Sequence, residues 1–219
     1  MIRLLSKYLL QHKLQAILVV ILFYAVGVAG IGIPLTQSFF IALIPYALLL
    51  SFILIVLFHS LLIKRSEIAF FISVFGLSYL IEVIGVNTHF PFGNYSYGSG
   101  LGLKVFETPL MIGINWVMLV YCSASILERT GWTPMIQVFI AAALMVIYDL
   151  VLEHVAPKLE MWSWAGNSIP FQNYLAWFAL GVCFHGSMKI LKIRTVNPVA
   201  PAIFICQFLF FAVIMTFVK

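Results

Sequence analysis

Residues 40–62 read FIALIPYALLLSFILIVLFHSLL, a run without a single Asp, Glu, Lys or Arg. A helix needs about 20 mostly apolar residues to cross the hydrocarbon core of a bilayer, so this run predicts a transmembrane helix. Six more segments have the same character: 14–32, 67–86, 109–127, 134–155, 171–189 and 198–218. The sequence therefore predicts an all-α membrane protein with about seven transmembrane helices, which form a single integral-membrane domain over residues 1–219.

The composition predicts the same class of protein. Hydrophobic residues make up 63% of the chain and charged residues 9%, whereas soluble domains carry roughly 25% charged residues. Mean hydropathy is +1.11. This balance excludes a disordered chain, an ordinary nucleic-acid binder and a secreted disulfide scaffold. Cys122, Cys183 and Cys206 lie in apolar runs without pairing or metal-ligand spacing, so they are interpreted as small core residues.

The basic residues orient the predicted helices, because Lys and Arg concentrate in cytoplasmic loops. With seven spans and a cytoplasmic N-terminus, nine of the twelve basic residues fall inside: Arg3, Lys7, Lys13, Lys64, Arg65, Arg129, Lys189, Lys192 and Arg194. Three fall outside: Lys104, Lys158 and Lys219. This division predicts a multi-pass protein of the cell (inner) membrane with its N-terminus in the cytoplasm.

Two connections are longer than a turn, and both fall on the predicted outer side. Residues 87–108 read NTHFPFGNYSYGSGLGLKVFET, and residues 156–170 read APKLEMWSWAGNSIP. Both are rich in Gly, Pro, Asn and Ser, which interrupt helices, and in aromatic residues, which favour the membrane interface. Long loops in an otherwise economical chain tend to carry function.

Carboxyl groups occur inside the predicted helices near this outer side. Glu82 lies roughly one turn before the end of its helix, while Asp149 and Glu153 are four residues apart and share one helix face. Such residues are costly in a membrane, and no Lys or Arg lies in the outer halves of these helices. The neighbouring helices begin with amides and indoles: Asn115, Trp116, Asn173 and Trp177. We therefore expect one polar cluster beneath the two outer loops.

Solvation at helix ends is an alternative explanation for part of this cluster. It is the preferred interpretation of Glu107, and it also fits Glu153 and His154. The tryptophans fit an aromatic belt at the interface equally well. Glu82 and Asp149 lie deepest, where a purely structural carboxylate usually requires a basic partner, so these two residues are the strongest functional candidates.

The residues leave two kinds of chemistry open. No zinc-ligand pattern, nucleophile triad or glycine-rich phosphate loop is present, and the last helix has no interior Lys to carry retinal. No metal or cofactor is therefore expected. Membrane-embedded carboxyls with aromatic neighbours are suited to proton-linked transport. They are equally suited to acid chemistry on a lipophilic substrate, in which a buried carboxyl protonates a carbon and aromatic faces stabilise the cation.

Four stretches of sequence carry a family resemblance. They are EVIGVNTHFPFGNYSYGSGLG (82–102), TPLMIGINW (108–116), YDLVLEHVAPKLEMWSW (148–164) and IPFQNYLAW (169–177). Together they resemble the bacterial and archaeal carotenoid-biosynthesis membrane proteins that include the carotenoid 1,2-hydratases. The resemblance covers about residues 75–178, the motif-bearing core.

One departure from the family pattern falls at the end of the fifth predicted helix. Glu153-His154 stands where an Asp-Pro pair is common in this family.

The resemblance implies a cofactor-independent hydratase. Such an enzyme adds water across the terminal C=C bond of an acyclic (ψ) carotenoid end, as in γ-carotene or lycopene, and forms a tertiary alcohol. The candidate catalytic residues are Asp149, Glu82 and Glu153, with Asp149 as the preferred proton donor. The candidate substrate-binding residues are Asn115, Trp116, Asn173, Trp162, Trp164, Trp177, Tyr95 and Phe92. The implied partners are a carotenoid, the lipid bilayer and other carotenoid-pathway enzymes.

Two other functions compete with the hydratase. A small proton-coupled transporter is expected to have inverted repeats and helices broken near the midplane, but no repeat is visible and the polar residues gather near one face. A carotenoid- or lipid-binding membrane protein without catalysis accounts for the aromatic residues. It does not account for carboxyls that lack basic partners.

Overall fold

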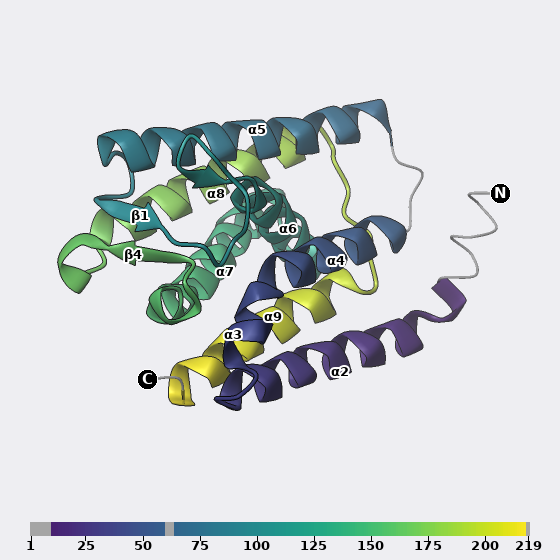
Figure 1. Ribbon diagram of the computed structural model, residues 1–219. Helices are drawn as coiled ribbons and strands as arrows, with labels where there is room; N and C mark the ends of the chain where they lie inside the picture. The colour runs from purple at the N-terminus through teal and green to yellow at the C-terminus, as the bar shows by residue number, and fades with distance from the viewer. Residues whose placement is uncertain (1–9, 60–63, 218–219) are drawn as a thin grey trace.

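The computed structural model describes residues 10–59 and 64–217, which form a bundle of helices with two small sheets at one end (Figure 1). The helices are α2 (Lys13–Gly32), α3 (Gln37–Ala42), α4 (Ile44–Leu57), α5 (Arg65–Thr88), α6 (Leu110–Leu127), α7 (Pro134–Val155), α8 (Phe171–Ile190) and α9 (Ala200–Phe217). The strands are β1 (Tyr95–Tyr97), β2 (Lys104–Val105), β3 (Thr108–Pro109) and β4 (Trp162–Trp164). Two 3₁₀ turns flank β4: Pro157–Leu159 and Ala165–Asn167.

Five helices of the described residues are long and apolar enough to cross a membrane, namely α2, α5, α6, α7 and α9. They confirm a predominantly helical membrane protein, but the expected count of seven spans is not confirmed. The segment 40–62 is not one continuous helix. It is interrupted at Leu43, between α3 and α4, and Pro45 lies in the first turn of α4. Proline clashes with the preceding helical turn. The 14 residues of α4 span only about 21 Å, less than the roughly 30 Å of hydrocarbon.

The other difference concerns α8, which has the length of a span but less apolar character. Its 20 residues include Gln172, Asn173, His185 and Lys189. Both α4 and α8 nevertheless pack within the bundle, α4 against α6 and α8 against α7.

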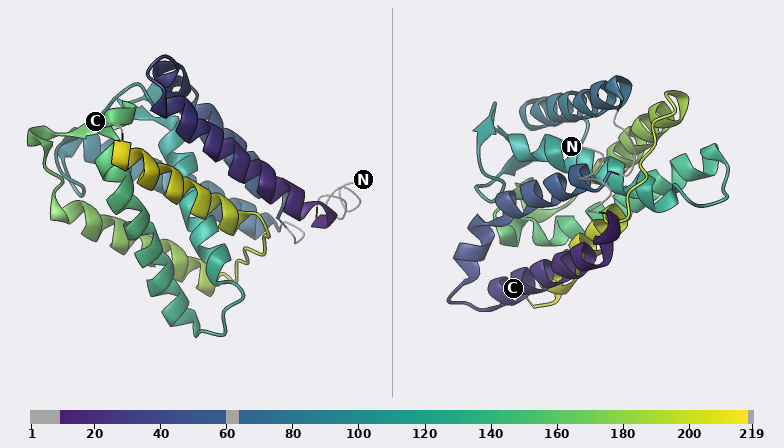
Figure 2. Two further views of the ribbon diagram at one scale, coloured as in Figure 1. Left: turned by 90° about the horizontal axis from the view of Figure 1, so that it is seen from below. Right: turned by 90° about the vertical axis from the view of Figure 1, so that its right-hand side faces the viewer.

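The centre of the bundle is α6, which contacts α4, α5, α7, α8 and α9. In α6, 78% of the candidate span is buried, compared with 22–39% in the four other candidate spans. The surrounding helices therefore present most of their apolar side chains outward, as expected for contact with lipid tails. Figure 2 shows α2 and α9 side by side along one flank of the bundle.

The two long loops meet at one end of the bundle, which we call the loop end. Strand β1 from the first loop pairs antiparallel with β4 from the second, and Ser96 lies opposite Ser163 (Figure 1). Side chains alternate across a strand. The Tyr-x-Tyr and Trp-x-Trp triplets therefore bury their aromatic rings, while the two serines between them are exposed. The two predicted loops contain short strands because this alternation has the period of a β-strand.

Two glycines allow the loops to touch. The N–H of Gly98 donates to Met161 O at 2.8 Å, and that of Gly100 donates to Glu160 O at 2.7 Å. A Cβ atom at either glycine would lie 2.2 Å from a carbonyl oxygen of the second loop. A side chain at these positions would push the loops apart.

The opposite end of the bundle collects basic residues. Helix directions place Lys64 before α5, Arg129 after α6 and Lys189 at the end of α8, all away from the loops. Arg3, Lys7 and Lys219, which contribute to the predicted orientation, lie outside the described residues.

Candidate active site

Glu82 lies near the end of α5 beneath the paired loops and is 3% exposed. Its Oε2 accepts hydrogen bonds from the hydroxyls of Tyr95 at 2.6 Å and Tyr97 at 2.8 Å. Its Oε1 accepts one from the indole N–H of Trp116 at 3.0 Å. The carboxyl therefore acts as an acceptor toward three donors from two different segments.

The two tyrosines are fixed as donors. Burial, followed by the charge of Glu82, raises the pKa of Tyr95 and of Tyr97. Both phenols therefore keep their protons over the physiological pH range and can donate them to Glu82.

Glu153, on the last turn of α7, has a similar set of donors from the second loop and α8. Its Oε2 accepts from the indoles of Trp162 at 2.9 Å and Trp164 at 2.6 Å, and its Oε1 accepts from Asn173 Nδ2 at 3.2 Å. Glu153 is 3% exposed, so solvation at a helix end does not describe it.

Asp149 lies one turn earlier on α7 and is fully buried. Its Oδ2 accepts from Asn173 Nδ2 at 2.9 Å, so this one amide joins Asp149 to Glu153. Its Oδ1 has no hydrogen-bond partner among the described residues. A carboxyl oxygen that receives no donor is the position at which a carboxylic acid can carry its own proton.

No cation neutralises these carboxyls within residues 10–59 and 64–217. Arg194 and Glu128 form a salt bridge at 2.8 Å, but it lies at the end of the bundle opposite the loops. The surroundings of Glu82, Asp149 and Glu153 consist of neutral donors and aromatic rings, as expected from the absence of Lys and Arg in these parts of the sequence.

Glu82 and Glu153 line one small cavity of about 20 Å³ under the β1–β4 sheet. Its wall includes Phe92, Asn173 and Trp177. A polar cavity needs at least about 10–15 Å³ and several hydrogen-bonding groups to hold a water molecule. This cavity is thus large enough for one water molecule between two carboxyls.

Aromatic rings enclose the cavity. Trp116 stacks on Trp177 with ring centroids 4.1 Å apart. Phe92 and Tyr95 form a T-shaped pair with ring centroids 6.1 Å apart. The structure thus assembles most of the candidate residues in one place: Glu82, Asp149, Glu153, Trp116, Asn173, Trp162, Trp164, Trp177, Tyr95 and Phe92.

Asn115 is placed slightly apart from the cluster. It is buried and lines a neighbouring cavity of about 10 Å³ with Tyr148 and Trp162. His89, His154 and Glu107 are exposed, so solvation explains Glu107 and His154 as the sequence suggested.

Comparison with known proteins gives this arrangement a context. The profile of the carotenoid biosynthesis protein family matches residues 41–219. The chain belongs to this family. A bisanhydrobacterioruberin hydratase of Haloarcula japonica is 28% identical over 117 residues, which cover 48% of this chain and 38% of that relative. The matched part is thus well under two thirds of the relative's length. No solved structure matches the chain.

The family match is wider than the sequence motifs suggested. It extends beyond the expected core of about 75–178 at both ends and includes α4 and α9. Glu82, Asp149, Glu153 and their hydrogen-bond donors lie within it. The candidate site therefore lies inside the matched part of the chain.

Tyr97 was missed as a candidate site residue. It donates to Glu82 as Tyr95 does, and the sequence held the signal, because residues two apart on a strand share a face. The same reasoning pairs Trp162 with Trp164, which both donate to Glu153.

Proposed function

We propose that this protein is a carotenoid hydratase that adds water across the terminal C=C bond of an acyclic carotenoid end, such as that of lycopene or γ-carotene. The observation that carries the proposal is the water-sized cavity between Glu82 and Glu153, with Asp149 beside it and no basic partner among the described residues. Membership of a carotenoid biosynthesis family and a distant relative named as a hydratase support it.

Asp149 is the proposed acid. Glu82 and Glu153 each accept three hydrogen bonds, which favours their ionised forms, whereas Asp149 accepts one and keeps Oδ1 open. Several carboxyls in one low-dielectric site cannot all ionise readily, so Asp149 retains a proton. Transfer of that proton to the less substituted alkene carbon gives a tertiary carbocation and an Asp149 carboxylate.

Water then completes the reaction. The oxygen of the water held between Glu82 and Glu153 bonds to the cationic carbon, and one water proton passes to a carboxylate of the cluster. Return of that proton to Asp149 restores the enzyme, so the net change is addition of one H and one OH. The carboxylates and the faces of the Trp116–Trp177 pair stabilise the cation meanwhile.

Continuous helices favour this function over proton-coupled transport. Transporter sites are typically built by helices that break near the midplane. Here α5 runs unbroken through Glu82 and α7 unbroken through Asp149 and Glu153, close to their ends at the loops.

Pigment analysis in a host that makes lycopene or γ-carotene tests the proposal. The wild-type chain should yield a carotenoid heavier by one water. Asp149→Asn removes the transferable proton at nearly constant shape, so it should abolish hydration while the protein remains in the membrane; Glu82→Gln should act likewise. Glu107→Gln, an exposed carboxyl at the same end, serves as the control. Near wild-type product from both buried amide variants would show that these carboxyls are structural.

The proposed reaction needs no metal or nucleotide, because proton transfer and addition of water balance without an electron acceptor. Hydration by purified protein in lipid should therefore survive a chelator. Loss of activity on chelation, with recovery after zinc or iron is added, would contradict this expectation.

A further inference from the structure

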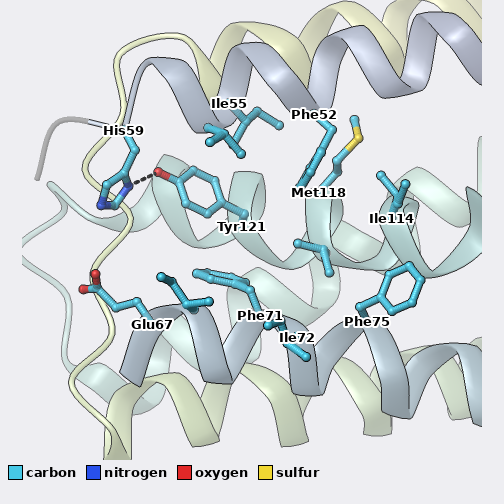
Figure 3. Close-up of a pocket in the computed structure, with 13 residues that line it drawn as sticks. Phe52, Ile55, His59, Glu67, Phe71, Ile72, Phe75, Ile114, Met118 and Tyr121 are labelled. Carbon is cyan, nitrogen blue, oxygen red and sulfur yellow. Dashed lines mark hydrogen bonds between the residues drawn. The ribbon is translucent and has the colours of Figure 1, made fainter. Parts of the chain in front are cut away.

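A second and much larger cavity lies away from the carboxyl cluster. It occupies the space between α4 and α5, with α6 as its floor, and measures about 400 Å³ (Figure 3). We call it the α4–α5 groove. Its residues are almost entirely apolar; Phe52, Phe71, Phe75, Ile114 and Met118 are among those that line it. A ligand of this groove must be apolar over most of its length, and flat aromatic neighbours suit a conjugated chain.

The groove follows the direction of α5. Its lining on this helix extends from Glu67 to Phe75, eight residues or about 12 Å of helix. Glu82 lies seven residues beyond Phe75, which is two turns and therefore nearly the same helix face. A rod-shaped molecule in the groove thus points one end toward the carboxyl cluster.

The end of the groove away from the carboxyl cluster is polar and is lined by His59, Tyr121 and the buried carboxyl of Glu67 (Figure 3). There, His59 Nδ1 and the hydroxyl of Tyr121 are 2.6 Å apart (Figure 3). Asn197 fixes the direction of this contact. Its Oδ1 accepts from the backbone N–H groups of Val199 and Ala200, so its Nδ2 must be the group that donates to Tyr121 at 3.3 Å.

Within the described part of the chain, these hydrogen bonds occupy Nδ1 of His59 and leave Nε2 without a hydrogen-bond partner. The Tyr121 hydroxyl accepts from Asn197, and among the described contacts its own proton finds an acceptor only at His59 Nδ1. In the arrangement that satisfies this proton, a neutral His59 carries its own proton on Nε2. This Nε2 is buried and has no partner among the described residues. A buried donor without an acceptor is unfavourable, and a ligand oxygen placed there would satisfy it.

We propose that the α4–α5 groove binds a polyene that carries an oxygen atom at one end, with that oxygen accepting a hydrogen bond from His59. The inference rests on the proposed hydratase function and adds to it the class of preferred substrate. A linear carotenoid already hydrated at one end has this form. Bound with its hydroxyl at His59, it lies along α5 in the direction of the loop end, so the groove selects polyenes that already carry one hydroxyl.

Equilibrium binding to the full-length protein in lipid nanodiscs tests the proposal without catalysis. The probes are lycopene and lycopene hydrated at one end, each followed by the shift in polyene absorption. Wild-type protein should bind the hydroxylated probe about tenfold more tightly, as expected for one buried hydrogen bond. His59→Phe should abolish this preference and leave lycopene affinity within about twofold. Tyr121→Phe, which frees the histidine tautomer, should weaken the preference.

A matched pair of variants on α5 tests the location. Ile72 lines the groove at its open side, whereas Leu77 on the same helix is 52% exposed and lies outside it. Ile72→Trp should lower the affinity for both probes at least about tenfold, and Leu77→Trp should leave both unchanged. Equal affinities for the two probes in wild-type protein would overturn the proposal. So would full polyene binding in Ile72→Trp with loss of a co-purifying membrane lipid, which would identify lipid as the occupant.

These outcomes are separate from those for the hydratase reaction. If the buried carboxyl variants hydrate normally, the catalytic assignment fails and the binding preference is untouched. If hydration proceeds as proposed but the His59 variants keep the preference, the groove assignment alone fails.

Discussion

Glu82 and Glu153 are each held by three neutral donors from two chain segments. Such preorganisation matters for catalysis because the groups that meet developing charge do not have to reorient during the reaction. Trp116 shows how one side chain serves two purposes. Its N–H bonds to Glu82, and its ring stacks on Trp177.

These two roles of Trp116 can be separated. Trp116→Phe keeps an aromatic ring for the stack and removes the N–H donor. We expect kcat to fall about tenfold with KM nearly unchanged, and the free energy of unfolding to fall by about 1 kcal/mol, because one buried acceptor loses a donor. Kinetics and thermal unfolding of the purified protein measure both. Trp132→Phe, at an exposed indole, is the control, and an unchanged kcat in Trp116→Phe would remove Trp116 from the positioning role.

The depth of the carboxyls was predictable from the residues, but their partners were not. Apolar run lengths and basic residues place Glu82, Asp149 and Glu153 at one level, because helix rise is regular. The donors to Glu82 and Glu153 come from strands in the loops, and their direction depends on a pairing between segments more than 60 residues apart. Local sequence does not fix such a register. The interruption of the helix at Leu43 was predictable, since Pro45 follows it.

The β1–β4 sheet covers a cavity of about 20 Å³, which is large enough for one water molecule but too small for the end of a carotenoid. In the proposed reaction the alkene can enter only if part of the cavity wall moves, and we expect the β1–β4 sheet to be that part. Ser96 and Ser163 are exposed and directly opposite each other in the two strands. Directly opposed residues of an antiparallel pair have Cα atoms about 4.5–5.5 Å apart, a separation that a disulfide can bridge.

A disulfide between the strands tests whether they separate. The Ser96→Cys/Ser163→Cys double variant should lose most activity when oxidised and regain it on reduction, because the crosslink prevents the loops from parting. Hydration rates before and after a reductant measure the effect, with each single cysteine variant as a control. Full activity in the oxidised double variant would mean that the substrate reaches the carboxyls by another path, without separation of the sheet.

Helix α6 connects the two regions of the molecule. Ile114, Met118 and Tyr121 line the α4–α5 groove, while Trp116 on another face of the same helix bonds to Glu82. This double use explains why α6 is far more buried than the other candidate spans. It also separates the apolar groove, with its polar end at His59, from the carboxyl cluster at the loop end.

The basic residues predict the orientation of this arrangement in the membrane. Nine of the twelve fall on the side expected to be cytoplasmic, so the loops and the carboxyl cluster should face outward. Ser99 and Ser168 are exposed at the loop end, and Gly131 is exposed at the other end with open space around it. In a background without native cysteines, Ser99→Cys and Ser168→Cys should react with an impermeant thiol reagent added to intact cells. Gly131→Cys should react only after the cells are opened. Labelling with the reverse pattern would invert the protein and place water entry to the carboxyls on the cytoplasmic side.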